Sequence, residues 1–292
     1  MISITNELIT VGIKKVGAEL ASLKRIDSQL EYIWKADPSY WGRHSCLLFP
    51  VIGSVNADVI RVDGEVYPMK KHGIVRDLPF TLENKEEDRA VFTIESDNEL
   101  KKMFPFDWKL DVIYELVQNR CRIIYKVENR SQGLMPLSIG AHPGITCPLD
   151  PNKKRSDYHL LFDSIETQDS PLLNDNGLVK SDTKRIMEAS SRIDIIDELF
   201  DEDALILSDY QSSTVSLVDD EGHTHVRVGI DGFTHLGIWS QNRRSPYICI
   251  EPWIGHADPE GYKGEFKDKP GNALLTVGET LTCEHWIEIF DK

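Results

Sequence analysis

Apolar and polar side chains alternate with a period of two residues along most of this 292-residue chain. The alternation predicts β-strands, because successive side chains of a strand point to opposite faces of its sheet. Strands are predicted over Ile2–Ile9, Glu19–Arg25, Ala90–Ser96, Trp108–Val117, Arg120–Val127, Thr214–Val218, Val226–Ile230, Leu236–Trp239, Tyr247–Ile250, Ala273–Val277 and Thr282–Ile289. Turn-forming pairs such as Asp63-Gly64 separate many of them, and the two strands around Gln118-Asn119 predict a tight hairpin. We therefore expect an all-β protein.

Helical signal is weak by comparison. One short helix is predicted from Ser96 through Lys102, where Ser96-Asp97-Asn98-Glu99 has the pattern of a capping box, and a second near Ile195–Phe200. The sequence has no internal repeat and no long linker. We predict a single domain over residues 1–292, built as a β-sandwich or super-sandwich with few short helices.

The charge balance restricts the partners of the chain. Its 48 acidic and 33 basic residues give a formal net charge of -15, whereas nucleic acids and anionic membranes attract clustered positive charge. The N-terminus lacks the pattern of a signal peptide, and no apolar run approaches the roughly 18 residues of a membrane span. The cysteines are odd in number and scattered, which favours reduced thiols over a disulfide framework or a zinc site: Cys46, Cys121, Cys147, Cys249 and Cys283. We expect a cytoplasmic protein, a monomer or homodimer, without nucleic-acid or membrane partners.

Two titratable residues interrupt apolar, strand-like segments. His142 stands among small residues next to Pro143, so a ligand could approach its imidazole, a common acid or base near neutral pH. Glu251 ends the apolar run Tyr247–Ile250, and a buried carboxylate is costly unless it is paired or functional. A histidine bonded to backbone and a glutamate in a structural ion pair are the alternative interpretations.

Three further sets of residues could contact a small polar ligand. His72 and Arg76 can place two donors together, although a solvated basic loop has the same composition. The acidic run Asp201–Asp203 could bind hydroxyls or could simply be solvated. Three tryptophans could each supply an apolar platform for a sugar ring or could pack in the core: Trp41, Trp239 and Trp253.

Four segments in sequence order resemble the aldose 1-epimerase (galactose mutarotase) superfamily, and within it the LacX-like branch. They are Phe49–Gly53, Tyr67–Arg76, Gly140–Gly144 (GAHPG) and Ile250–Trp253 (IEPW), and with the tail from Val277 the resemblance covers nearly the whole chain. It implies a galactose mutarotase-like β-super-sandwich and an isomerase that interconverts the α and β anomers of a hexose. It implies a small-molecule sugar substrate, no cofactor and no metal.

The resemblance also implies roles for individual residues. His142 matches the general-acid histidine of the family, Glu251 its general-base glutamate and His72 its second, sugar-binding histidine. Asp203 matches the aspartate that holds sugar hydroxyls, with Glu202 as the alternative alignment. The acid and the base transfer protons to and from two sugar oxygens that are bonded to the same carbon. We therefore expect His142 and Glu251 to lie within about 9 Å of each other.

Two departures from the family pattern leave the sugar open. Ser54 stands where the branch commonly has an arginine, so Arg76 is expected to supply the cationic donor, and Trp253 stands near where aldose-specific members have a glutamine. A hexose-6-phosphate 1-epimerase is an alternative, with a phosphate clamp drawn from Arg43, Lys70, Lys71 and Arg76. A non-catalytic carbohydrate-binding protein on the same fold is another.

Overall fold

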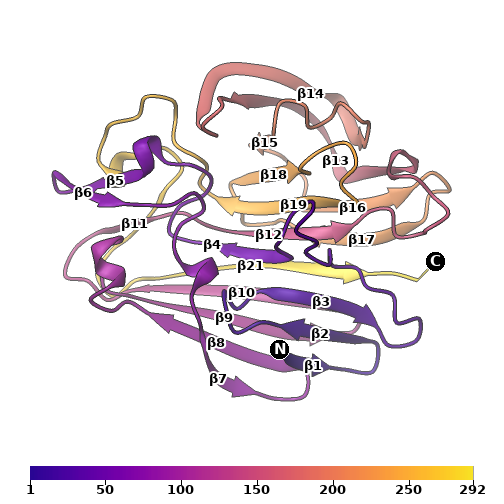
Figure 1. The fold of residues 1–292 in the computed structure, drawn as a ribbon, viewed down its shortest axis with the longest axis horizontal. Coiled ribbons are helices and arrows are strands. Elements are labelled where there is room, and N and C mark those ends of the chain that lie inside the picture. The colour runs from indigo at the N-terminus through magenta and orange to yellow at the C-terminus, as the bar shows by residue number, and fades with distance from the viewer. Residues whose placement is uncertain (292) are drawn as a thin grey trace.

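The computed structural model describes residues 1–291, and most of them lie in antiparallel strands (Figure 1). The larger main sheet has nine strands in the order β14-β13-β16-β17-β21-β10-β9-β8-β7. In that order they span Val179–Asp194, Tyr158–Leu173, Thr214–Asp219, Thr224–Gly229, Thr280–Ile289, Arg120–Asn129, Trp108–Val117, Arg89–Glu95 and Thr81–Lys85. The hairpin predicted at Gln118-Asn119 is confirmed, because Val117 pairs with Arg120 across a turn in which Gln118 has a φ of 55°.

A second sheet of five strands occupies the centre of Figure 1 and has the order β15-β18-β19-β12-β4. In that order the strands span Leu205–Ser208, His235–Trp239, Tyr247–Ile254, Ile139–Thr146 and Ser45–Leu48. The long β13–β14 hairpin lies beside this sheet in the upper part of the view. This is the sheet that carries the candidate site.

The remaining elements are short. Three small sheets are formed by β1 (Ile2–Thr5), β2 (Ile9–Ile13) and β3 (Leu20–Arg25), by β5 (Val59–Val62) and β6 (Glu65–Pro68), and by β11 (Met135–Leu137) and β20 (Ala273–Leu275). Within residues 1–291 the helices are single 3-10 turns: η1 (Asn56–Asp58), η2 (Val75–Asp77), η3 (Leu100–Lys102), η4 (Arg155–Asp157) and η5 (Phe266–Asp268). None of the helices in this part of the chain could cross a membrane.

The two main sheets contribute to one hydrophobic core, and the alternation of side chains decides which face of the five-stranded sheet enters it. On β19, Ile248 and Ile250 pack into that core, whereas Cys249 and Glu251 point to the other face. On β12, Ala141 packs into the core and His142 lies on the other face. The face away from the core is therefore the one that exposes polar side chains to a cavity.

Several boundaries differ from the sequence predictions. Ile2–Ile9 is not one strand, because Asn6 Oδ1 accepts hydrogen bonds from the N–H groups of Leu8 and Ile9 and turns the chain between β1 and β2. The helix predicted near Ile195–Phe200 is wrong, since the segment has no helical element and forms turns. The helix predicted from Ser96 is shorter and consists of η3 alone. At its start Asp97 Oδ1, rather than the Ser96 side chain, accepts hydrogen bonds from the N–H groups of Glu99 and Leu100.

Candidate active site

The pairing register of β12 and β19 brings His142 and Glu251 together. Gly140 pairs with Trp253 and Gly144 with Cys249 across β12 and β19, so the same register sets His142 opposite Glu251 on one face of the sheet. On the far side of β19, Gly237 of β18 pairs with Glu251. Two residues distant in sequence thus become neighbours through strand pairing alone.

Glycines on both sides of β19 make room for the Trp253 indole. A Cβ built on Gly140 would lie 2.5 Å from the indole ring, and one built on Gly237 would lie 2.4 Å from it, both too close for a real side chain. The ring therefore lies over the backbone of both neighbouring strands, next to Glu251. This arrangement gives the cavity an aromatic floor.

His142 and Glu251 are close but incompletely bonded. His142 Nδ1 lies 3.4 Å from Glu251 Oε1, and the two side chains are only 8% and 2% exposed. His142 Nδ1 and Glu251 Oε2 have no hydrogen-bond partner. Buried polar atoms normally have partners, so an incompletely bonded pair facing a cavity is typical of a ligand-binding or catalytic site.

Burial shifts the pKa values of the pair toward the neutral forms. It lowers the pKa of His142 to about 3, and the positive charges of Lys71 and Arg76 act in the same direction. It raises the pKa of the Glu251 carboxyl well above its usual range; Lys71 opposes this shift and Asp203 adds to it. Between these two pKa values the pair holds one proton, which resides on Glu251 in the form that burial favours and can pass to His142 across the 3.4 Å that separates them.

Aromatic rings fix the orientation of the His142 imidazole. Trp41 stacks on it with ring centroids 4.5 Å apart and an interplanar angle of 25°. Trp239 and His72 each contact it edge-on, at centroid distances of 5.6 and 5.5 Å. Rings on three sides restrict imidazole rotation, so its nitrogens keep fixed directions.

His72 presents a hydrogen-bond donor to the cavity. Its Nδ1 accepts the N–H of Gly53 at 3.2 Å, and burial lowers its pKa well below the usual range, so the ring is neutral with the proton on Nε2. Its backbone φ is 66°, and its side chain lines the cavity wall. A neutral imidazole with Nε2–H exposed to the cavity can donate to a ligand oxygen.

The cavity has a volume of about 200 Å³, which suits a small molecule of the size of one monosaccharide. Its lining residues are Trp41, Cys46, Ile52, Gly53, Lys71, His72, Arg76, His142, Leu173, Gly177, Asp203, Ala204, Ile206, Trp239, Glu251, Trp253 and Ala257. Every site residue predicted from the sequence is among them. Asp203 rather than Glu202 lies at the cavity, because Glu202 forms an ion pair with Lys184 at 3.0 Å.

The cations near the cavity differ in whether they line it and in whether they are already held in an ion pair. Lys71 is exposed at the cavity and has no ion pair within residues 1–291. Arg76 lines the cavity with its Nε buried, without a hydrogen-bond partner and 3.7 Å from Asp77 Oδ2. Arg43 and Lys70 are not part of the lining, and Arg43 pairs with Asp77 at 2.8 Å. Of the four cations considered for a phosphate clamp, two are in place.

Part of the cavity wall has no signal in the sequence. Leu173 ends β13 and Gly177 lies in the turn before β14, and both reach the cavity because this hairpin lies beside the five-stranded sheet. Cys46 lines the cavity because it pairs with His142 from β4. All five cysteines are buried and unpaired. Such contacts depend on tertiary pairing, which no local motif encodes.

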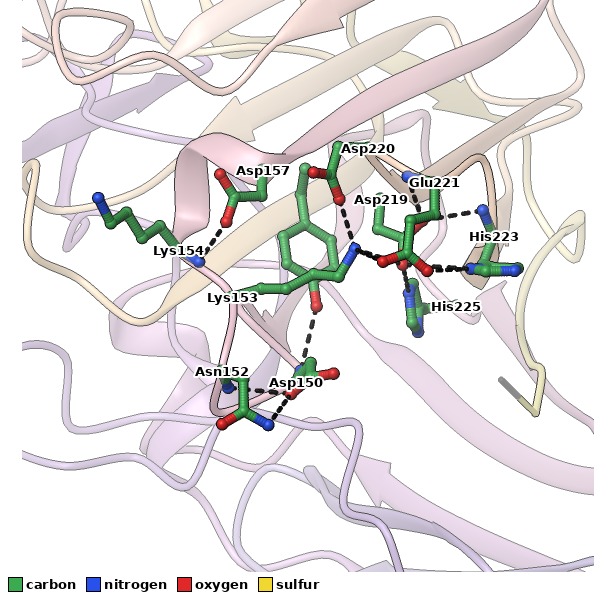
Figure 2. A network of polar contacts seen from close by, with 11 residues as sticks. Asp150, Asn152, Lys153, Lys154, Asp157, Asp219, Asp220, Glu221, His223 and His225 are labelled. Carbon is green, nitrogen blue, oxygen red and sulfur yellow. Dashed lines mark hydrogen bonds and ion pairs between the residues drawn. The ribbon is translucent and has the colours of Figure 1, made fainter.

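A second cluster of titratable residues lies at the β16–β17 turn and takes no part in lining the cavity (Figure 2). Lys153 Nζ contacts Asp219 at 3.3 Å and Glu221 at 3.2 Å and forms a further ion pair with Asp220. Asp219 also contacts His225 Nε2 at 3.0 Å. Three neighbouring carboxylates thus surround the Lys153 ammonium, so the cluster has the composition of a structural network.

Comparison with known proteins agrees with the resemblance noted in the sequence. The family model described as aldose 1-epimerase matches residues 1–272. Protein LacX of Lactococcus lactis subsp. lactis, in its plasmid and chromosomal forms, is 34% identical over 277 residues, or 92% of each chain.

Solved structures show the same fold. A galactose mutarotase related enzyme from Lactobacillus acidophilus superposes with a TM-score of 0.94 at 30% identity, over 99% of this chain and 97% of that chain. A galactose mutarotase-like protein from Lactobacillus casei ATCC 334 superposes with a TM-score of 0.93 at 30% identity, over 99% of this chain and 100% of that chain. The predicted galactose mutarotase-like β-super-sandwich is confirmed.

Proposed function

This chain belongs to the aldose 1-epimerase family, and from that premise we propose that it interconverts the α and β anomers of a hexose by acid/base ring opening and closure. One observation carries the proposal: a buried imidazole and a buried carboxylate, 3.4 Å apart, line one small cavity. The anomeric and ring oxygens of a sugar are bonded to one carbon and lie about 2.3 Å apart. Two groups at this spacing can each reach one of those oxygens.

The proposed reaction moves two protons and breaks one bond. The Glu251 carboxylate takes the proton of the anomeric hydroxyl while the C1–O5 bond breaks and the His142 imidazolium gives its proton to O5. The products are an open-chain aldehyde and a neutral Glu251–His142 pair, the form that burial favours. Rotation about C1–C2 and closure on the other face of C1 return both protons, so the enzyme ends as it began.

The other lining residues would bind and orient the sugar. Trp253 and Trp239 offer apolar faces for the C–H face of the ring, and His72 offers its Nε2–H to an oxygen. Asp203 can accept hydrogen bonds from two hydroxyls, and Arg76 can donate to a third oxygen. Orientation of this kind would set both reacting oxygens toward His142 and Glu251.

A hexose-6-phosphate 1-epimerase is the second candidate, and the free ammonium of Lys71 at the cavity favours it. Together with Arg76 it could bind a phosphate at the cavity mouth, although two cations make a weaker clamp than the set considered from the sequence. In this reading inorganic phosphate at millimolar concentration should compete with the substrate.

The test is an anomerisation assay on a panel of free and 6-phosphorylated hexoses, with the spontaneous rate subtracted. The proposal predicts catalysis of a free hexose that millimolar phosphate does not inhibit. Catalysis confined to 6-phosphorylated sugars would replace it with the second candidate. Sugar binding without any acceleration would identify a non-catalytic carbohydrate-binding protein instead.

A further inference from the structure

Cys249 stands beside the acid/base pair, and the proposed reaction does not use it. It precedes Glu251 by two residues on β19, so both side chains lie on the same face of the sheet. Single ligand atoms of His142, Cys249 and Glu251 all lie within 4.8 Å of one another, and all three residues are buried. A thiol, an imidazole and a carboxylate therefore lie close together on one face of the sheet.

The spacing and chemistry of this trio match a zinc-class ion. Zinc binds nitrogen and oxygen ligands at about 2.0–2.2 Å and sulfur at about 2.3 Å, so two ligands of one tetrahedral ion lie about 3.4 Å apart. The separation of His142 Nδ1 and Glu251 Oε1 is 3.4 Å. A shift of about 1 Å in the Cys249 side chain would complete three ligands, with the fourth position left for water.

A second, independent observation points to a ligand at this place. His142 Nδ1 and Glu251 Oε2 are buried polar atoms without hydrogen-bond partners, on side chains 8% and 2% exposed. The other trio with suitable spacing, Asp219, Glu221 and His223, already holds the Lys153 ammonium against two of its members (Figure 2). Of the two trios in residues 1–291, only the one beside the cavity has buried ligand atoms without a hydrogen-bond partner.

We propose that His142, Cys249 and Glu251 form a binding site for one zinc-class divalent cation, and that the metal and the sugar exclude each other. On binding, the Cys249 thiol and the Glu251–His142 pair each lose one proton to solvent, and the sulfur, imidazole nitrogen and carboxylate each donate a lone pair to the ion. The ion occupies the lone pairs that proton transfer to the sugar requires, so it inhibits the epimerase. The inhibition rests on the proposed function, whereas the metal binding does not.

The test measures metal binding without any assay of activity. The metal-free protein is titrated with Zn²⁺ by calorimetry and with Co²⁺ by absorption spectroscopy, in which a thiolate ligand gives a charge-transfer band. We expect one equivalent to bind with that band present. Cys249→Ser should abolish the band and weaken zinc binding by more than the roughly 10–100-fold that loss of an outer-shell partner causes.

Two matched variants separate this site from others. Cys46→Ser changes the cysteine that pairs with His142 from β4, and His223→Gln removes a ligand of the second trio; both should keep the zinc affinity and the Co²⁺ spectrum. Cys249→Ala replaces the serine variant if that one unfolds. Absence of binding, or equal binding by wild type and the Cys249 variants, would overturn the proposal. Zinc binding without inhibition of sugar turnover would contradict the mutual exclusion of metal and sugar, whereas the metal site itself would still be supported.

Discussion

Glu251 and Asp219 are both buried carboxylates, each 2% exposed at the side chain, yet their surroundings move their pKa values in opposite directions. Asp219 accepts the backbone N–H groups of Glu221 and His223 and contacts Lys153 and His225. Burial alone would raise the pKa of Asp219, but these contacts outweigh burial and hold the pKa well below its usual range.

Glu251 has weaker support, from the charge of Lys71 and from Trp253, and burial outweighs it. One of its oxygens has no partner, its near neighbour His142 is itself buried, and burial raises its pKa. A fully bonded carboxylate stabilises the turn that it closes, whereas an underbonded one keeps its capacity to exchange a proton with a ligand. The comparison therefore assigns stability to one region and chemistry to the other, and each assignment can be tested by substitution.

The largest expected effect follows removal of the acid. His142→Gln keeps a polar side chain but cannot deliver a proton to the ring oxygen, so kcat for anomerisation should fall by about 10²–10⁴-fold. His72→Gln is the matched control, because His72 is proposed to bind the sugar rather than transfer protons; it should raise KM more than it lowers kcat. Equal losses of kcat in both variants would contradict the distinction.

The next effect concerns stability at the other carboxylate. Asp219→Asn loses charge-assisted hydrogen bonds and removes the buried carboxylate that contacts Lys153 and His225, so the free energy of unfolding should fall by about 2–4 kcal/mol. The folded variant should keep the wild-type rate, because Asp219 is not part of the cavity lining. Chemical denaturation measures the first and the anomerisation assay the second.

The stability difference should also depend on pH. The folded pKa of Asp219 is lowered, so the carboxylate stabilises the fold above its ordinary pKa of 3.8, and this contribution is lost as the pH falls through the folded value. The advantage of wild type over Asp219→Asn should thus be complete near neutral pH and shrink below pH 3.8. A difference that stays constant into acid would show that charge is not its cause.

A smaller effect is expected from the lysines of the two regions. Lys71 favours the ionised form of Glu251 from an exposed position, so Lys71→Met should lower kcat/KM for a neutral sugar by no more than about 5-fold. Lys153→Met should lower the melting temperature without changing the rate. A loss far above this limit, seen only with 6-phosphorylated sugars, would favour the second candidate function.

The smallest expected effect is that kcat/KM does not change with pH in the mildly acidic range. An ordinary glutamate titrates near 4.5 and an ordinary histidine near 6.5. Here His142 gains a second proton only as the pH falls toward about 3, and Glu251 keeps its proton above its usual range, so the pair holds one proton between these values. We expect kcat/KM to stay level from pH 4.5 to 6.5. An inflection near 6.5 would show that His142 is not desolvated.

The alternation in the sequence was sufficient to predict the all-β fold and the hairpin at Gln118-Asn119, because both depend on local patterns. His142 and Glu251 were identifiable because each interrupts an apolar strand with a titratable group. Their juxtaposition is set by the β12–β19 register, over more than a hundred residues of chain, and no local rule fixes that register.

Other features left no readable pattern. β13 and β14 were missed, because register shifts interrupt the alternation along their pairing and β14 is largely exposed. Cys249 alternates like any core residue, so its position beside the acid/base pair is visible only in three dimensions. Lys153 lies in a polar loop and meets Asp219 only through tertiary packing. The single domain over residues 1–292 and the monomer or homodimer state stay predictions.

The most direct measurement of the central claim is the anomerisation rate of Glu251→Gln, read together with its sugar affinity and its free energy of unfolding. Glutamine keeps the shape and hydrogen-bonding capacity of the side chain but cannot take the anomeric proton. We predict a loss of about 10²–10⁴-fold in kcat, near-normal sugar binding, and a free energy of unfolding equal to or above that of wild type, since an underbonded buried carboxylate is removed. A variant that interconverts anomers at the wild-type rate would contradict the assignment of Glu251 as the base, and one as destabilised as Asp219→Asn would contradict the contrast between the two carboxylates.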